Sequence, residues 1–301
     1  MRPILHHYPT SPWAEVVRLT LGMKGLDWGS VDVPVICPKP DLVVLTGGYV
    51  RTPVLQLGAD IFCDTLAISA ALEALAPGPT LYPAPLGEGH RALALEAGGP
   101  TFLAAVGVAL GDMPAEGNRA FWLDRQQRFG LDPVAFQSML PALHAAFEAH
   151  LSHLEGLLAD GRAFLGGEAV GHGDLAHYML LWFAARGAAI AELRPALAPW
   201  AARVAELGHG RPHPMSPEAS IEAARAAVPA PLRRSVDPDS GFASGQSVEV
   251  SQLGSNDPPV VGALLALDAQ GIAVRREDPA AGIVHVHFPR EGQRIAAAAP
   301  G

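Results

Sequence analysis

The segment that decides the fold lies near the amino terminus and reads ILHHYPTSPWAEVVRLTL over residues 4–21. Residues 4–8 predict a short β-strand, and apolar side chains then recur at helical spacing as far as Leu21. Ser11 and Pro12 stand between the two patterns. Serine is a favoured helix N-cap, and proline suits the first helical position because the N–H that it lacks would have no partner there. The segment therefore predicts a strand followed directly by a capped helix.

Two roles are open for Ser11. One is a plain helix cap. The other follows from the free N–H groups and partial positive charge of a helix N-terminus, which stabilise an anion such as a thiolate. Such surroundings lower the pKa of a thiol from about 8.5 to roughly 3.5–7.5, and a serine hydroxyl there can donate to the sulfur. Thr10 supplies a second hydroxyl beside it.

Two further short motifs follow in the same region. Arg51-Thr52-Pro53 places a proline at the entrance of an apolar strand pattern, where it indicates a sheet edge or a special turn. Asp64-Thr65 opens the next helical pattern with a carboxylate and a hydroxyl. These groups suit the α-amino and α-carboxylate groups of an amino-acid-like ligand, and they equally suit plain capping.

In this order and spacing, the three motifs resemble those of the glutathione transferase superfamily in its serine-type, bacterial-like form. The resemblance covers residues 3–207. It implies an α/β thioredoxin-like amino-terminal domain followed by an all-α helical domain. It also implies an enzyme that activates the glutathione thiol for attack on a small hydrophobic electrophile, and a homodimer that pairs the amino-terminal domain of one chain with the helical domain of the other.

The resemblance also implies specific roles for the motif residues. Ser11 matches the hydroxyl that activates the thiol, with Thr10 as the alternative catalytic hydroxyl. Thr52 matches the residue before a cis-proline, which holds the cysteinyl backbone of glutathione, and Asp64 with Thr65 matches the pair that binds its γ-glutamyl end. The predicted glutathione-binding residues are Pro12, Arg51, Thr52, Pro53, Asp64 and Thr65.

The sequence departs from the family pattern at two places. A Ser/Thr-x-x-Asp capping box usually precedes the buried helix of the second domain, and here Asp174 is present while Gly171 stands at the hydroxyl position. Replacement of a cap by glycine costs only a few tenths of a kcal/mol, so folding is not threatened. The second departure is a β-rich tail, which the two-domain pattern lacks.

Four parts are expected along the chain. Residues 1–77 alternate strand and helix patterns and predict the thioredoxin-like, glutathione-binding domain. Residues 86–207 are rich in alanine and leucine and predict the all-α domain. Residues 208–244 are rich in turn-forming residues and predict a linker, and residues 245–290 predict a small β-meander of three or four strands. A sheet of that size needs to dock on the rest of the protein to be stable.

The tail also supports a function of another class. A non-catalytic binding or assembly module can keep the glutathione transferase fold, with the β-extension contacting a partner or covering the cleft. A thiol-disulfide oxidoreductase is disfavoured, because Ser11 and Ala14 occupy the two positions where that chemistry places cysteine.

His285-Val286-His287 places two imidazoles on one face of a predicted strand, as a metal-binding pair requires. No convincing third ligand is near in sequence, so we expect no metal, and glutathione enters as a substrate.

Composition excludes other classes of partner. Lys and Arg number 21 against 30 Asp and Glu in 301 residues, giving a net charge of −9, which is opposite to that of a general nucleic-acid binder. Two cysteines are too few for a disulfide scaffold, and the amino terminus lacks the apolar stretch of a secretory signal. The longest apolar runs fall short of the ~20 residues that span a bilayer. We therefore expect a cytoplasmic protein with no nucleic-acid or membrane partner.

Overall fold

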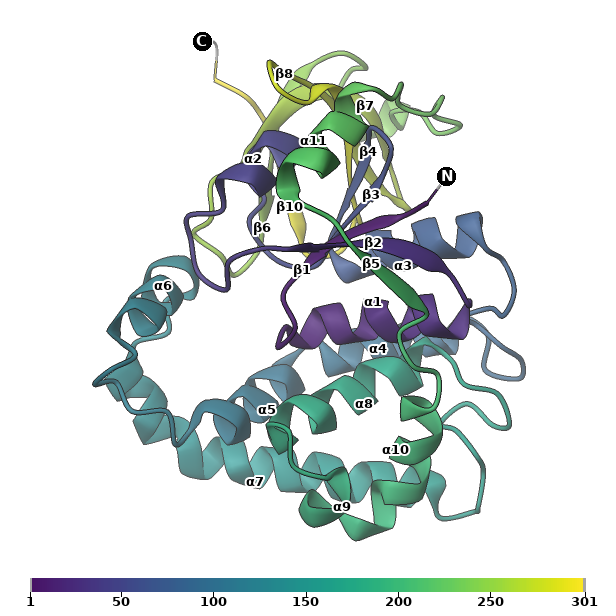
Figure 1. Cartoon of the computed structure of the whole chain (residues 1–301), viewed down its shortest axis with the longest axis vertical. Helices are drawn as coiled ribbons and strands as arrows, with labels where there is room; N and C mark the ends of the chain where they lie inside the picture. The colour runs from purple at the N-terminus through teal and green to yellow at the C-terminus, as the bar shows by residue number, and fades with distance from the viewer. Residues whose placement is uncertain (1, 300–301) are drawn as a thin grey trace.

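The strands form one continuous sheet, and most of the helices form a layer on one side of it (Figure 1). The computed structural model describes residues 2–299. The strands are β1 (Ile4–His7), β2 (Asp27–Asp32), β3 (Val54–Leu57), β4 (Asp60–Cys63), β5 (Arg211–Pro214), β6 (Ser247–Gln252), β7 (Val260–Asp268), β8 (Gly271–Asp278), β9 (Gly282–Phe288) and β10 (Gln293–Ala297). The helices are α1 (Pro12–Met23), α2 (Pro40–Thr46), α3 (Thr65–Leu75), α4 (Gly89–Ala97), α5 (Pro100–Leu110), α6 (Arg119–Phe129), α7 (Pro133–Leu158), α8 (His172–Ala185), α9 (Ile190–Leu193), α10 (Ala198–Ala205) and α11 (Pro217–Arg225), with short 3-10 helices at Pro195–Leu197 and Pro238–Ser240.

The amino-terminal elements confirm the predicted thioredoxin-like arrangement. Strand β1 pairs in parallel with β2 and antiparallel with β3, and β3 pairs antiparallel with β4. Helix α1 lies between the sheet and α8 (Figure 1). Its buried residues pack against both the sheet and the helical layer. Val17 packs with the sheet residue Leu5, while Val16 and Leu19 join the core of the helical layer.

The helical layer confirms the predicted all-α second part. The apolar stripe of α7 is buried at Phe147, Leu151 and Leu154, and α8 is buried along almost its whole length. Among the described helices, none is by itself long and apolar enough to span a membrane. Only α4 and α5 together meet that requirement by length and composition, and they are bent by 47° at the break between them.

The β-rich extension continues the amino-terminal sheet. The strand order is β10-β6-β7-β8-β9-β4-β3-β1-β2-β5, and β9 pairs in parallel with β4. One core includes Ile61 and Cys63 of β4 together with Val284, Val286 and Phe288 of β9. The extension therefore docks as expected, and it has five strands that end at Ala297, beyond the limit of 290 drawn from the sequence.

The segment 208–244, expected to be a linker, contains regular structure. Strand β5 pairs in parallel with β2 at the far edge of the sheet, and α11 lies beside α2 over one face of the sheet (Figure 1). All four residues of β5, which read RPHP, are exposed, and two of them are prolines without an N–H. An exposed edge strand of this composition carries no apolar periodicity, so its sequence resembles that of a loop.

The glycine at the cap of α8 has a packing reason. A Cβ at Gly171 would lie 2.3 Å from the Cε1 atom of His90, whose ring is fully buried. Asp174 still completes its side of the cap, since its carboxylate accepts the N–H groups of Gly171 at 3.0 Å and Leu165 at 2.8 Å. It also accepts the indole N–H of Trp200 at 2.9 Å. The imidazole of His90 thus takes the space that a capping hydroxyl would need.

Gly171→Ser, which supplies the family's usual hydroxyl, is expected to destabilise the fold by about 1–3 kcal/mol, because its Cβ would overlap the His90 ring. His90→Ala in the same chain opens space and should recover part of the loss. Urea unfolding of the two single variants and the double variant measures this coupling, and strictly additive changes would contradict the packing explanation.

Acid should destabilise the fold through buried imidazoles. Burial lowers the pKa of His6 and His172 from 6.5 to about 4, and that of His177 to about 3. Between these values and 6.5 the unfolded chain binds more protons than the folded one. The free energy of unfolding should therefore fall as pH drops from about 6.5 towards about 4, by up to about 1 kcal/mol per pH unit for each histidine. Urea midpoints at several pH values test this, and His172→Asn should make the decline shallower.

Candidate functional site

The sheet register brings the predicted motifs to one end of the sheet. His6 of β1 pairs with Val54 of β3, and Val54 pairs with Cys63 of β4. Pro53 comes directly before this row of paired positions and Asp64 directly after it, next to the loop that leads from β1 into α1. Three motifs that are far apart in sequence therefore meet at one end of the sheet.

Ser11 is the N-cap of α1, as predicted. Its Oγ accepts the N–H of Ala14 at 3.4 Å, and the residue is only 2% exposed. Because the hydroxyl acts as an acceptor in the cap, its own hydrogen stays available to donate to a sulfur atom. Thr10, the alternative hydroxyl, is exposed.

The loop before α1 is held by a buried arginine to which the sequence alone assigned no role. The guanidinium of Arg18 donates to the carbonyl oxygens of Tyr8 at 3.3 Å and Pro9 at 3.0 Å, and it pairs with Glu15 at 2.7 Å. Burial opposes ionisation of Glu15, but hydrogen bonds from His209 and Arg18 hold its pKa below the usual range. The charged pair thus fixes the backbone that carries Thr10 and Ser11.

The second and third motifs have distinctive backbone conformations at the same end of the sheet. The Thr52–Pro53 peptide is cis. Asp64 has φ 79° and ψ 143°, a conformation outside the left-handed helical region that residues other than glycine rarely adopt, and it caps α3 by accepting the N–H of Leu66 at 3.0 Å. Burial raises the pKa of Asp64, while the nearby Arg51 guanidinium opposes the rise. Thr65, the first residue of α3, is buried.

Arg51, another predicted ligand residue, is engaged by the carboxy-terminal extension. It donates to the carbonyl oxygen of Leu253 at 3.4 Å, and its Nε lies 3.7 Å from Oδ2 of Asp257. Asp257 in turn forms a two-point pair with Arg128 of α6, at 2.6 and 2.9 Å. The segment 253–259, which we call the β6–β7 loop, therefore connects the predicted site to the helical layer.

A cavity of about 490 Å³ lies beside this loop, and the buried lysine Lys39 forms part of its wall. Lys39 is 3% exposed, and its Nζ lies 5.6 Å above the ring of Tyr8, three residues before Ser11. Burial lowers the pKa of Lys39 to about 8. The residues around the cavity come from the loop before α2, from α2 and the segment after it, from α6 and from the β6–β7 loop, and they include Cys37, Lys39, Val50, Arg128, Asn256 and Asp257.

Sequence reasoning missed these cavity residues for an identifiable reason. Arg128 and Asp257 meet across 129 positions of sequence, and neither belongs to a local motif. The one available signal was Lys39 itself, an isolated cation in a proline-rich stretch next to Cys37. Burial raises the pKa of the Cys37 thiol, which does not favour a thiolate there.

Comparison with known proteins gives a strong match along the whole chain. A GST-like protein from Pseudomonas syringae is 37% identical, the alignment covers 99% of each chain, and the TM-score is 0.81. The likeness therefore includes the β-extension. Residues 5–80 also match the family model described as the glutathione S-transferase N-terminal domain. No curated protein sequence matches the chain.

More distant structures share the fold. A glutathione S-transferase from Methylobacterium radiotolerans, in complex with glutathione sulfonate, is 21% identical over 68% of this chain and 91% of its own, with a TM-score of 0.50. Glutathione S-transferase III in its apo form is 20% identical over 77% of this chain and 99% of its own, with a TM-score of 0.52. Together with the full-length match, these findings show that the chain belongs to the glutathione S-transferase superfamily and carries a carboxy-terminal β-extension.

Proposed function

We propose that the protein binds glutathione at the end of the sheet where Ser11, Thr52–Pro53 and Asp64 lie, and activates its thiol for attack on a small hydrophobic electrophile. The observation that carries the proposal is the convergence of these three motifs through the β1–β3–β4 register. The glutathione sulfonate complex of the Methylobacterium radiotolerans protein, which has the same fold, supports the choice of ligand.

Each end of glutathione finds a group of complementary charge. The carboxylate of Asp64 suits the γ-glutamyl ammonium, and the first N–H groups of α3 suit the neighbouring carboxylate. The backbone of Thr52 suits the cysteinyl peptide group. Lys39, whose Nζ lies 5.6 Å from the ring of Tyr8, is the cation that we assign to the glycyl carboxylate.

Ser11 is the group we assign to thiol activation. The N-terminus of α1 adds a partial positive charge beside it, and both favour the thiolate over the thiol. The electrophile would rest on a cluster of half-buried aromatic rings that begins with Trp13, two residues after Ser11. Trp13 packs on Phe102 at 5.4 Å between ring centres, and Phe102 stacks on Phe183 at 6.3 Å.

Ser11→Ala is expected to leave glutathione binding measurable by calorimetry, to raise the pKa of the bound thiol, and to lower the conjugation rate about 10²–10³-fold, as loss of one catalytic donor does. Ser216→Ala is the matched control. Ser216 caps α11 in the same way, accepting the N–H of Ala219 at 3.2 Å, and its loss should cost about 1 kcal/mol of stability without changing the rate.

Thr10→Val tests the alternative hydroxyl. A full rate in Ser11→Ala together with a loss in Thr10→Val would transfer the catalytic role to Thr10 and leave Ser11 as a cap. The absence of any heat of binding at about millimolar glutathione would remove the proposed function altogether.

One observation favours the second function, a module whose extension covers the cleft. Arg51 is held by Leu253 and faces Asp257, both in the β6–β7 loop, so the extension occupies one side of the predicted site. In that arrangement the loop competes with the ligand for Arg51.

Asp257→Asn should then raise the affinity for glutathione about threefold to tenfold, because it weakens the hold of the loop on Arg51 and Arg128. Asp268→Asn is the matched control, since it weakens a similar two-point pair with Arg234 at the other end of β7. Calorimetry of both variants measures the difference. A lower affinity in Asp257→Asn alone would show that the loop completes the site and does not cover it.

A further inference from the structure

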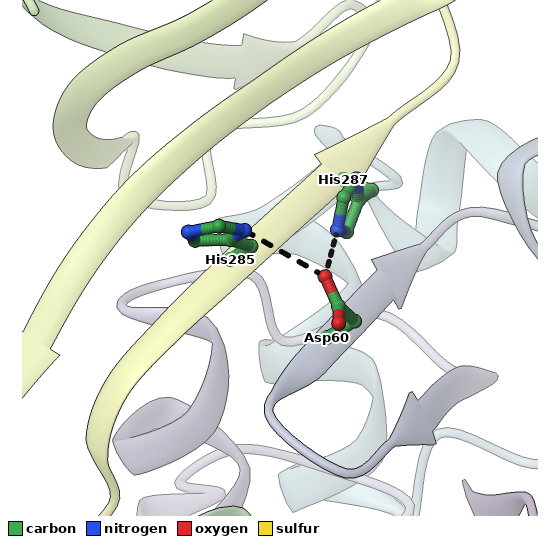
Figure 2. A group of neighbouring side chains, drawn as sticks. All are labelled: Asp60, His285 and His287. Carbon is green, nitrogen blue, oxygen red and sulfur yellow. Dashed lines mark hydrogen bonds and ion pairs between the residues drawn. The ribbon is translucent and has the colours of Figure 1, made fainter. Parts of the chain in front are cut away.

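Two histidines and an aspartate meet where the extension joins the amino-terminal sheet, on the opposite edge of β4 from β3. His285 and His287 lie on one face of β9 and point towards Asp60 of β4 (Figure 2). The parallel register pairs Asp60 with His285 and Phe62 with His287. The group is formed only by this pairing, since 227 positions separate Asp60 from His287.

The three side chains present their donor atoms at the spacing of metal ligands. Oδ1 of Asp60 lies 2.8 Å from Nε2 of His287 and 3.7 Å from Nδ1 of His285, and all three atoms lie within 4.8 Å of one another. Bonds of about 2.0–2.2 Å to a tetrahedral zinc ion separate neighbouring ligand atoms by about 3.3 Å. The two distances to Asp60 bracket that value, so small rotations bring the ligands to an ion.

One donor atom of the group has no partner without an ion. Nδ1 of His285 is buried and makes no hydrogen bond to any residue that the structure describes, although it faces the carboxylate. A hydrogen bond between His287 and Asp60 explains two members of the group and leaves this third atom unexplained. A buried polar atom without a partner needs an explanation, and a bound ion is one that fits a nitrogen facing a carboxylate.

Outer contacts hold two of the three side chains in place. The second carboxylate oxygen of Asp60 accepts the N–H of Ala230 at 2.7 Å, which leaves Oδ1 turned towards the histidines. The ring of His287 stacks on Phe62, with 4.4 Å between ring centres and 12° between planes. Such second contacts orient the ligands of known metal sites.

The surroundings allow an ion to enter. The side chain of His285 is 16% exposed, so the group reaches the surface. Arg275 pairs with His285 in the register of β8 and β9, and its positive charge would repel a metal ion. Its guanidinium lies 3.2 Å from the carboxylate of Glu277, which offsets that charge.

We propose that Asp60, His285 and His287 bind a divalent transition-metal ion, with water as the fourth ligand, and that this ion fastens the extension to the amino-terminal sheet. Two imidazoles and one carboxylate are a donor set suited to Zn²⁺ and to Co²⁺. The metal site is separate from the predicted glutathione site, because Asp60 is the first residue of β4 and Asp64 follows the last residue of that strand.

The test uses the full-length protein without an affinity tag, stripped with a chelator and returned to Zn²⁺ or Co²⁺. We expect one ion per chain by elemental analysis, the visible absorption of four-coordinate Co²⁺, and a higher unfolding temperature with Zn²⁺ than with chelator. Absence of stoichiometric binding and of a zinc-dependent temperature shift in this protein would overturn the proposal, whatever the result for glutathione.

His285→Ala is the decisive variant, because this partly exposed side chain has no hydrogen bond to lose. Loss of an outer contact lowers metal affinity about 10–100-fold, and loss of a direct ligand should exceed that. His144→Ala, at an exposed position of α7, should bind metal normally. Equal affinity in His285→Ala and His144→Ala would also overturn the proposal, even if Asp60→Asn fails to fold.

Discussion

The parallel pairing of β9 with β4 determines how the rest of the molecule is arranged. Without it, β4 would be an open edge of the amino-terminal sheet, with a row of unpaired N–H and C=O groups. With it, five further strands continue the same sheet, and Ile61 and Cys63 share a core with Val284 and Val286. The extension is thus part of the same sheet and core as the strands that carry the predicted glutathione site.

This pairing also explains why the extension reaches the site. Once β9 is fixed beside β4, the antiparallel strands β8, β7 and β6 follow in order, and the β6–β7 loop comes to lie against Arg51 and Arg128. It also limits where a second copy of the chain can bind. The edge of β4 is already taken, so the homodimer implied by the family resemblance, which stays a prediction, requires other surfaces.

Local signals in the sequence predicted the capped helix, whereas contacts between distant segments could not be predicted from the sequence. Ser11 followed by Pro12 indicated a capped helix because capping depends on neighbouring residues only, and the structure confirms it. The roles of Ser11 and Asp64 in binding or catalysis remain predictions. Asp257 and Asp60 gave no signal, because their partners lie at distant positions in the chain.

The family pattern itself helped at some positions and misled at others. It predicted the two confirmed parts of the fold, but the missing hydroxyl at Gly171 appeared as a simple loss until the ring of His90 was seen in that space. Strand β5 was missed because two prolines and four exposed positions remove the alternation by which strands are recognised.

The β4–β9 pairing has a consequence for the order of events during protein synthesis. Strand β4 leaves the ribosome well before β9, and His287 follows its partner Asp60 by 227 positions. At about 5–20 residues per second, the edge of β4 and its apolar face wait about 10–45 s for their cover. The amino-terminal sheet depends here on the last fifth of the chain for its cover. The nascent protein therefore carries an uncovered strand edge for most of its synthesis, and this is the interval in which chaperones have most to protect.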